Sequence, residues 1–127
     1  AECENLDTLF GKILNELSRL GEDNRTIVCF SSDHGEMLGD HNLVGKLVPW
    51  QGSISVPLIC SGPGIRSRQV IHRAVSTRDL GETFLDYARH SRVQRRSNAS
   101  RSLRGLLETG HDNEYHMFVL SGHGSWR

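Results

Sequence analysis

The chain has 127 residues, a formal net charge of zero and a mean hydropathy of −0.43, with 36% hydrophobic residues. This length is enough for one domain with a core of its own. The balanced charge and the lack of a long apolar run argue against nucleic acid and membrane as partners. Acidic residues predominate in residues 1–60 and basic residues in residues 61–127, which is typical of solvated faces.

The three cysteines are widely spaced along the chain. No Cys-x-x-Cys pair is present, which argues against a structural zinc site. Cys29 and Cys60 lie inside apolar runs, so we expect them to be small core residues.

The first elements predicted from the sequence are a helix and a strand. Apolar residues recur every three or four positions from Leu6 to Leu20, and Gly21 is placed to end that helix. A polar turn leads to the apolar run Thr26–Phe30, which predicts a buried strand. A helix, a short turn and a buried strand are typical of α/β proteins. We therefore expect part of a mostly parallel sheet flanked by helices, with the first helix covering the sheet.

The stretch Ser32–His41 contains the candidate site. Asp33 and His34 follow the predicted strand, where open α/β sheets place their chemistry, and can hold a divalent cation. Lys46 can hold an anion next to that cation. Glu36 is expected to serve a local helix start.

Two further residues of this region are candidates for substrate binding, His41 and Trp50. The alternative for both is that they brace the loop, which Pro49 keeps irregular.

The rest of the chain predicts scaffold. Val56–Cys60 predicts a second buried strand and Gln69–His72 a short edge strand. Ser76 and Asp79 have capping-box spacing before a helix that ends near Arg89. The arginine-rich segment 89–104 predicts a solvated loop or, alternatively, a surface for a polyanion such as a sulfated glycan. A short helix at Leu103–Leu107 and a last strand at Tyr115–Leu120 complete the prediction.

The stretch Ser32–His41 and the segments around it resemble the sulfatase family of the alkaline-phosphatase-like superfamily. The resemblance rests on the motif Ser-Asp-His-Gly-Glu-x-x-Gly-Asp-His at Ser32–His41, on Gly45-Lys46 and on Val56–Ile59. It extends over roughly residues 5 to 110 and includes Asn5–Asp7, Ser61–Ile65 and Val75–Leu80.

The resemblance implies hydrolysis of sulfate esters by a formylglycine and a calcium-like ion. It assigns Asp33 and His34 to the metal and Lys46, a catalytic residue, to the sulfate. The chain lacks the formylglycine motif Cys/Ser-x-Pro/Ala-x-Arg and an N-terminal acidic metal pair, and Gln51 and Ser55 stand where Glu and Arg are common.

We therefore expect residues 1–127, which begin without methionine, to be one partial domain from the C-terminal portion of a sulfatase catalytic domain. The expected cofactor is Ca²⁺, with Mn²⁺ or Mg²⁺ as alternatives, and the expected substrate of the complete enzyme is a sulfated small molecule or glycan. Formylglycine is expected only in the missing N-terminal part, so this segment alone should be inactive.

Two other functions stay open. One is a phosphate or phosphonate monoester hydrolase of the same superfamily, since both groups are tetrahedral oxyanions. The other is a non-catalytic metal- or anion-binding module. An incomplete sheet should also expose an apolar edge, so we expect self-association. The sequence assigns no compartment.

Overall fold

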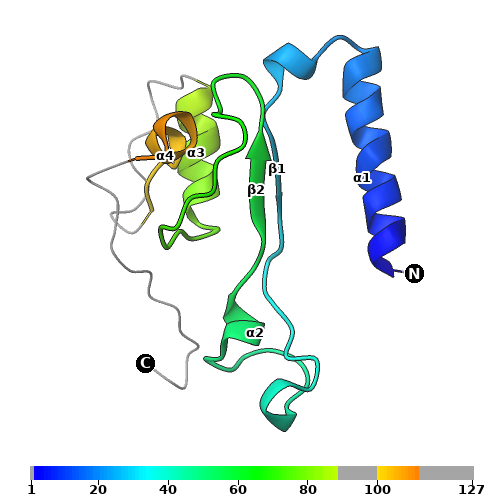
Figure 1. The fold of residues 1–127 in the computed structure, drawn as a ribbon, viewed down its shortest axis with the longest axis vertical. Helices are drawn as coiled ribbons and strands as arrows, with labels where there is room; N and C mark the ends of the chain where they lie inside the picture. The colour runs from blue at the N-terminus through cyan, green and yellow to red at the C-terminus, as the bar shows by residue number, and fades with distance from the viewer. Residues whose placement is uncertain (1, 89–99, 112–127) are drawn as a thin grey trace.

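The computed structural model describes residues 2–88 and 100–111. A two-stranded sheet runs through the middle, with helix α1 on one side and helices α3 and α4 on the other (Figure 1). A long loop that contains the short helix α2 extends beyond one end of the strands (Figure 1). None of the helices in the described ranges is long and apolar enough to cross a membrane.

Helix α1 (Glu2–Arg19) follows the predicted apolar pattern and starts a turn earlier than expected. Gly21 ends it with a φ of +68°, where the Gly21 amide donates to Ser18 and the Glu22 amide to Leu17, both at 3.0 Å. These two bonds form a Schellman motif, which satisfies the last carbonyls of the helix. A turn of 3₁₀ helix, η1 (Asp23–Arg25), then leads into the sheet.

The expectation that α1 buries itself against the sheet is wrong. No residue of α1 is buried, and Leu9 and Ile13 are 56% and 57% exposed. The helix stands beside the strands and touches them through Phe10, whose ring meets that of Phe30 edge to face at 5.5 Å between centroids.

The strands β1 (Val28–Ser31) and β2 (Leu58–Ser61) pair antiparallel, with Phe30 opposite Ile59. The parallel arrangement that we expected is therefore not formed by the strands in the described residues. A parallel pair requires the chain to return to the start of the first strand, usually through a helix. Here the connection stays beyond the far end of β1 and enters β2 directly from that end (Figure 1).

The antiparallel register also places Cys29 opposite Cys60, with 4.2 Å between their Cα atoms, and the two form a disulfide. Our expectation of two separate core cysteines is thus corrected. The strands are also less buried than predicted: β1 is half-buried throughout, and in β2 Ile59 is 65% exposed.

The core lies between β2 and the two helices on its other side, α3 (Asp79–Tyr87) and α4 (Arg104–Thr109). Its centre consists of Leu103, Leu106 and Leu107, against which Leu58 and Cys60 of β2 pack. Thr83, which is fully buried, joins the two helical segments: its hydroxyl donates to the Asp79 carbonyl at 2.6 Å and accepts from the Leu103 amide at 2.8 Å.

The predicted capping box before α3 is formed in part, because its side-chain bonds are present while the N-cap of the helix is Arg78. The Ser76 hydroxyl accepts from the Arg78 amide at 3.3 Å, and the Asp79 carboxylate accepts from the Ser76 amide at 2.9 Å. The same carboxylate accepts from the Arg101 amide at 3.0 Å, so the cap also holds the segment that enters α4. The predicted short helix at the leucines is confirmed as α4.

The edge strand predicted at Gln69–His72 is wrong, because this segment has no regular structure. It is held instead by the Gln69 side chain, which donates to the Leu107 carbonyl at 2.7 Å. The predicted strand Tyr115–Leu120 and most of the arginine-rich segment lie outside the described residues. At the end of that segment, Arg104 pairs with Glu108 at 2.8 Å and Asp86 at 3.4 Å.

Candidate functional site

The loop that follows β1 closes on itself and brings Lys46 back towards the end of the strand. The Glu36 carboxylate accepts a short hydrogen bond from the Gly45 amide, and the Met37 amide donates to the Gly45 carbonyl at 2.9 Å. Our assignment of Glu36 to a helix start is wrong, because its side chain closes this loop. A second 3₁₀ turn, η2 (Asp40–Asn42), forms the tip of the loop.

Close backbone packing fixes the base of the loop against α2 (Gln51–Ile54). The Gly35 amide donates to the Ser53 carbonyl at 2.8 Å, and a Cβ at Gly35 would overlap the Gly52 carbonyl oxygen. Only glycine fits here, since any side chain would push α2 away from the loop. Met37 fills the space beside Gly52 and is 2% exposed.

The loop between these anchors has strained backbone. Left-handed φ values are rare for residues other than glycine, and they cost energy that the surrounding structure must supply. Four such residues lie in this loop: Leu38, His41, Asn42 and Leu47. Strain concentrated in one loop is a common feature of functional sites.

Asp33, His34 and Lys46 form a cluster at the end of β1. The His34 Nε2 atom is in close contact with Lys46 Nζ and lies 3.5 Å from the Asp33 carboxylate. The other ring nitrogen, Nδ1, lies 2.9 Å from the Gly35 carbonyl. With the proton on Nδ1 donated to that carbonyl, Nε2 carries a lone pair directed at the cluster, which is the arrangement of a metal-binding histidine.

The surroundings of the Asp33 carboxyl group favour its ionised form. The His34 amide donates to it at 3.0 Å, and this bond is the largest cause that holds the pKa of Asp33 below its usual value. Its side chain is 83% exposed and that of His34 41% exposed. The cluster is therefore open to a ligand and to other residues.

His41 and Trp50 lie on the same loop and form a pair of their own. Their rings stack with 4.2 Å between centroids and 22° between planes. His41 also faces the Asp40 carboxylate at 3.9 Å. The contact agrees with the loop-bracing alternative, and Trp50 remains 45% exposed.

The donor set partly fits a divalent cation. A carboxylate and an imidazole nitrogen are suitable ligands for Ca²⁺, Mn²⁺ or Mg²⁺. Within residues 2–88 and 100–111, however, no group of three or more histidine, cysteine or acidic side chains is placed to hold a metal. Further ligands would have to come from outside this part of the chain.

Comparison with known proteins identifies the family. The Sulfatase family matches residues 2–90, which include the loop and the cluster. The chain belongs to the sulfatase family. The resemblance found in the sequence motif is thereby confirmed.

Relatives within the sulfatase family come from animals and bacteria. The chain is 38% identical to arylsulfatase K of Gallus gallus over 112 residues, which are 88% of this chain and 21% of the relative. It is 39% identical to an arylsulfatase of Clostridium perfringens over 88 residues, 66% of this chain and 18% of the relative. The chain thus spans about a fifth of the length of these relatives.

Solved structures show the same fold segment. The phosphonate monoester hydrolase of Silicibacter pomeroyi matches with a TM-score of 0.76 and 32% identity, over 87% of this chain and 21% of that one. A protein solved in complex with its substrate D-glucosamine-2-N,6-O-disulfate matches with a TM-score of 0.70 and 28% identity, over 92% of this chain and 22% of that one. This sulfatase chain therefore has the architecture of one part of the family fold.

The sequence did not reveal the residues that support the cluster. Glu36, Gly35 and Ser53 shape the loop through contacts with partners far along the chain, and nothing in their local pattern indicates those partners. Two glycines close to the motif, Gly35 and Gly52, were the available signal of a close backbone approach.

Proposed function

We propose that this chain forms one side of the active site of a metal-dependent sulfate ester hydrolase. The observation that carries the proposal is the contact of His34 Nε2 with Lys46 Nζ beside the Asp33 carboxylate, on a loop closed by backbone bonds. One cation-binding pair and one cationic side chain then face the same small volume. A bound metal ion and a cationic side chain together can offset the negative charge of a tetrahedral oxyanion.

Asp33 and His34 would hold the cation, Ca²⁺ as the first choice and Mn²⁺ or Mg²⁺ as alternatives. The lowered pKa of Asp33 keeps the carboxylate ionised, and the Gly35 carbonyl orients the His34 ring. When bound, the cation would supply positive charge that polarises the sulfuryl group. The remaining ligands would come from other parts of the complete protein.

Lys46 would contact the sulfate oxygens and is the catalytic residue of this chain. Its ammonium group can offset the negative charge that develops on those oxygens in the transition state. The bonds of Glu36 and Met37 to Gly45 hold its backbone in place. The formylglycine nucleophile is expected outside this chain, so we propose that residues 1–127 alone are inactive.

His41 and Trp50 would bind the body of the substrate. Their stacked rings present a flat apolar surface on the loop that carries Lys46. Such a surface suits the ring of a sulfated small molecule or the sugar of a sulfated glycan. The relative solved with D-glucosamine-2-N,6-O-disulfate supports the glycan.

A phosphonate monoester is the second candidate substrate. Two phosphonate monoester hydrolases match this chain with a TM-score of 0.76 each. The cluster itself does not separate the two, because sulfate and phosphonate monoesters both present tetrahedral oxygens to Lys46.

The test uses the natural polypeptide that contains residues 1–127, produced with formylglycine-generating enzyme. Its rates are compared on 4-nitrophenyl sulfate and 4-nitrophenyl phenylphosphonate, before and after metal removal with EDTA. We expect preference for the sulfate, loss of rate with EDTA, and recovery with Ca²⁺.

The matched variants are Lys46→Met and Lys12→Met. We expect Lys46→Met to lower kcat/KM by about 100-fold or more, the typical effect of losing one transition-state contact. Lys12, on α1, should be replaceable without effect. Equal rates for the two variants would refute the role of Lys46, and faster phosphonate hydrolysis would favour the second candidate. A protein that binds metal and sulfate but hydrolyses neither ester would be the non-catalytic module.

A further inference from the structure

A pocket with a basic rim lies between β2, α4 and the irregular segment of residues 65–75. Its volume is about 590 Å³, within the range of sites for small molecules. Its lining includes none of Asp33, His34 and Lys46. The pocket is therefore separate from the cluster at the end of β1, and a ligand could bind in it whether or not the proposed function is correct.

The floor of the pocket is apolar and already formed. It consists of the core residues Leu106 and Leu107 with the partly buried Ile65, Ile71 and Val75. The segment that forms the wall is fastened to α4. The Gln69 side chain donates to the Leu107 carbonyl at 2.7 Å, and the Arg66 amide donates to the same carbonyl at 2.9 Å.

The rim is basic, and the described residues bring no opposite charge to it. Arg66, Arg68 and Arg73 line the pocket, and no acidic residue of the described ranges does. Among residues 2–88 and 100–111, none of these three guanidinium groups has a carboxylate within 4.0 Å. By contrast, Arg19 is paired with Glu16 and Arg104 with Glu108.

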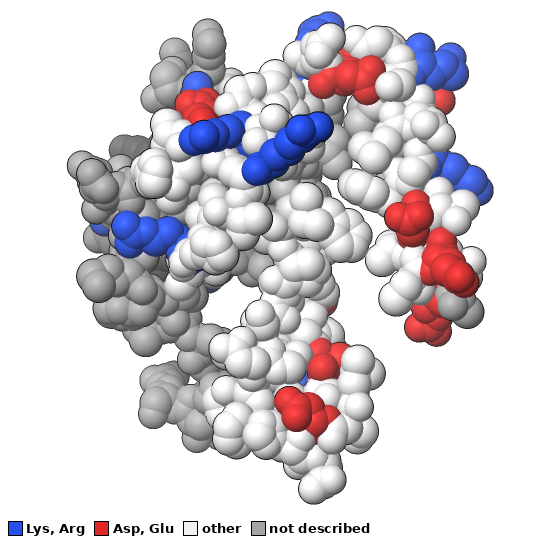
Figure 2. Space-filling view, viewed as in Figure 1, with Lys and Arg blue, Asp and Glu red and all other residues white. Residues whose placement is uncertain are grey.

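The charge pattern of the surface agrees with this description. Acidic side chains are exposed along α1 and on the loop at the bottom of Figure 2. Basic side chains lie at the upper left, over the part of the molecule that contains α3 and α4, with an acidic group beside them, and others lie on α1 (Figure 2). An anion that enters the pocket would meet the three arginines of its rim.

We propose that this pocket binds a small amphipathic anion, with an apolar ring on the leucine floor and an oxyanion head at the arginines. Arginine recognises sulfate, sulfonate and carboxylate groups through paired N–H donors. The apolar floor excludes water beneath the ring and adds affinity that an inorganic anion would not gain. The ligand class is thus an aromatic or alicyclic sulfate, sulfonate or carboxylate.

The experiment titrates the 127-residue chain with 1-naphthalenesulfonate, which no ester hydrolase can cleave. Binding is followed by calorimetry and by methyl NMR shifts. We expect shifts at Ile65, Ile71 and Val75, and weaker binding of both 1-naphthalenemethanol and inorganic sulfate. Shifts confined to Ile13 and Leu14 of α1, or no binding at millimolar probe, would overturn the proposal.

The decisive variant is Arg68→Gln with Arg73→Gln. It leaves Arg66 in place, because the Arg66 side chain also donates to the Thr109 carbonyl at 3.2 Å and helps to hold α4. We expect the dissociation constant to rise about five- to tenfold, as for the loss of two exposed charge contacts. Lysine at both positions should restore most of the affinity.

The matched control is Arg78→Gln, an exposed arginine outside the pocket lining. It should leave the dissociation constant unchanged, and unchanged methyl spectra would show that each variant is folded. Equal affinity for the double variant and the control would overturn the proposal.

Discussion

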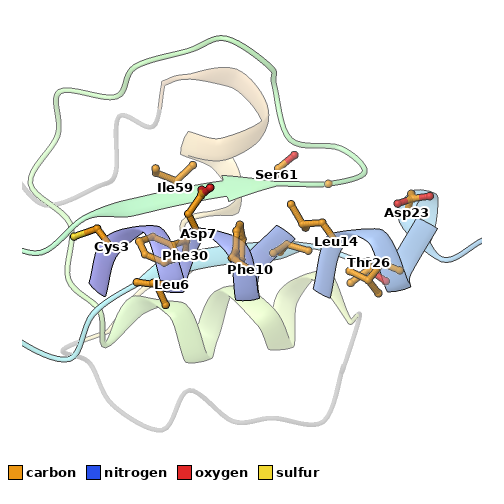
Figure 3. Close-up of a pocket in the computed structure, with 13 residues that line it drawn as sticks. Cys3, Leu6, Asp7, Phe10, Leu14, Asp23, Thr26, Phe30, Ile59 and Ser61 are labelled. Atoms are coloured by element: carbon orange, nitrogen blue, oxygen red, sulfur yellow. The ribbon is translucent and has the colours of Figure 1, made fainter. Parts of the chain in front are cut away.

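The two faces of the β1–β2 sheet differ in how completely they are covered. On the inner face, which we define by Leu58 and Cys60, the strands pack against the leucine core of α4. On the outer face, defined by Val28, Phe30 and Ile59, the strands and α1 enclose an open groove of about 620 Å³ (Figure 3). Phe10 and Leu14 of α1 lie on one side of this groove and Ile59 on the other (Figure 3).

The difference comes from how each helix is attached. Helices α3 and α4 are tied to one another by buried bonds, such as that between Thr83 and Leu103. Helix α1 is connected through an exposed turn and one aromatic contact. Both faces have apolar side chains, so composition alone does not decide which face becomes a core. The difference follows the hydrogen bonds, which fix α3 and α4 in place and are few for α1.

Removing one leucine from each side is the strongest test of this comparison. Leu106 is 1% exposed, and Leu6, which lines the outer groove, is 52% exposed. We expect Leu106→Ala to lower the free energy of unfolding by about 2–5 kcal/mol, because it leaves a cavity in the core. Leu6→Ala should cost about 1 kcal/mol or less. Urea denaturation measures both, and equal losses would refute the contrast.

Opening the disulfide should affect both faces, since it joins the two strands. Cys29 and Cys60 are 31 residues apart, and their link restricts the unfolded chain. Replacing both by alanine should lower the free energy of unfolding by about 2–4 kcal/mol. Cys3→Ser is the matched control, because Cys3 is exposed and free. The same loss in the control would show that the disulfide is not the cause.

The exposed outer face should make the chain self-associate. Ile59 is 65% exposed on a strand whose outer edge is unpaired within the described residues. We expect Ile59→Lys to weaken association by about tenfold, the effect of no longer burying one large apolar side chain.

Sedimentation velocity at several concentrations measures this association. Val44→Lys is the control, since Val44 is 85% exposed but lies on the loop, away from the groove. A clean monomer of the unmodified chain at high concentration would contradict the prediction.

Local elements could be predicted from the sequence, and contacts between distant segments could not. The helix stop at Gly21 and the capping box at Ser76 and Asp79 depend on neighbours within a few residues. The strand pairing depends on the path of the long connection after β1. No local pattern specifies that path, so parallel pairing was the wrong choice for these two strands.

The same distinction between local features and long-range contacts holds for the candidate site. Residue types and spacing were enough to select Asp33, His34 and Lys46, and the structure places their side chains together. Their roles stay predictions. The support for the cluster comes from Glu36 bonding to Gly45 and from Gly35 packing on Gly52, contacts that depend on how the loop folds.

Tyr87 offers the smallest and most local test, because it packs against the core of the inner face. Burial, and after it the charge of Glu108, raises the pKa of Tyr87 above its usual value of 10.0. The folded state therefore holds the phenol proton more tightly than the unfolded state does. Stability from this group is present below pH 10 and falls as the pH rises through the folded pKa.

Absorbance at 295 nm measures this titration in a Tyr115→Phe background, where Tyr87 is the one remaining tyrosine. Glu108→Gln should lower the pKa of Tyr87 only part of the way, since burial is the larger cause. A phenol that titrates at its ordinary pKa in the folded chain would mean that water reaches the ring. The inner face would then be as open as the outer one.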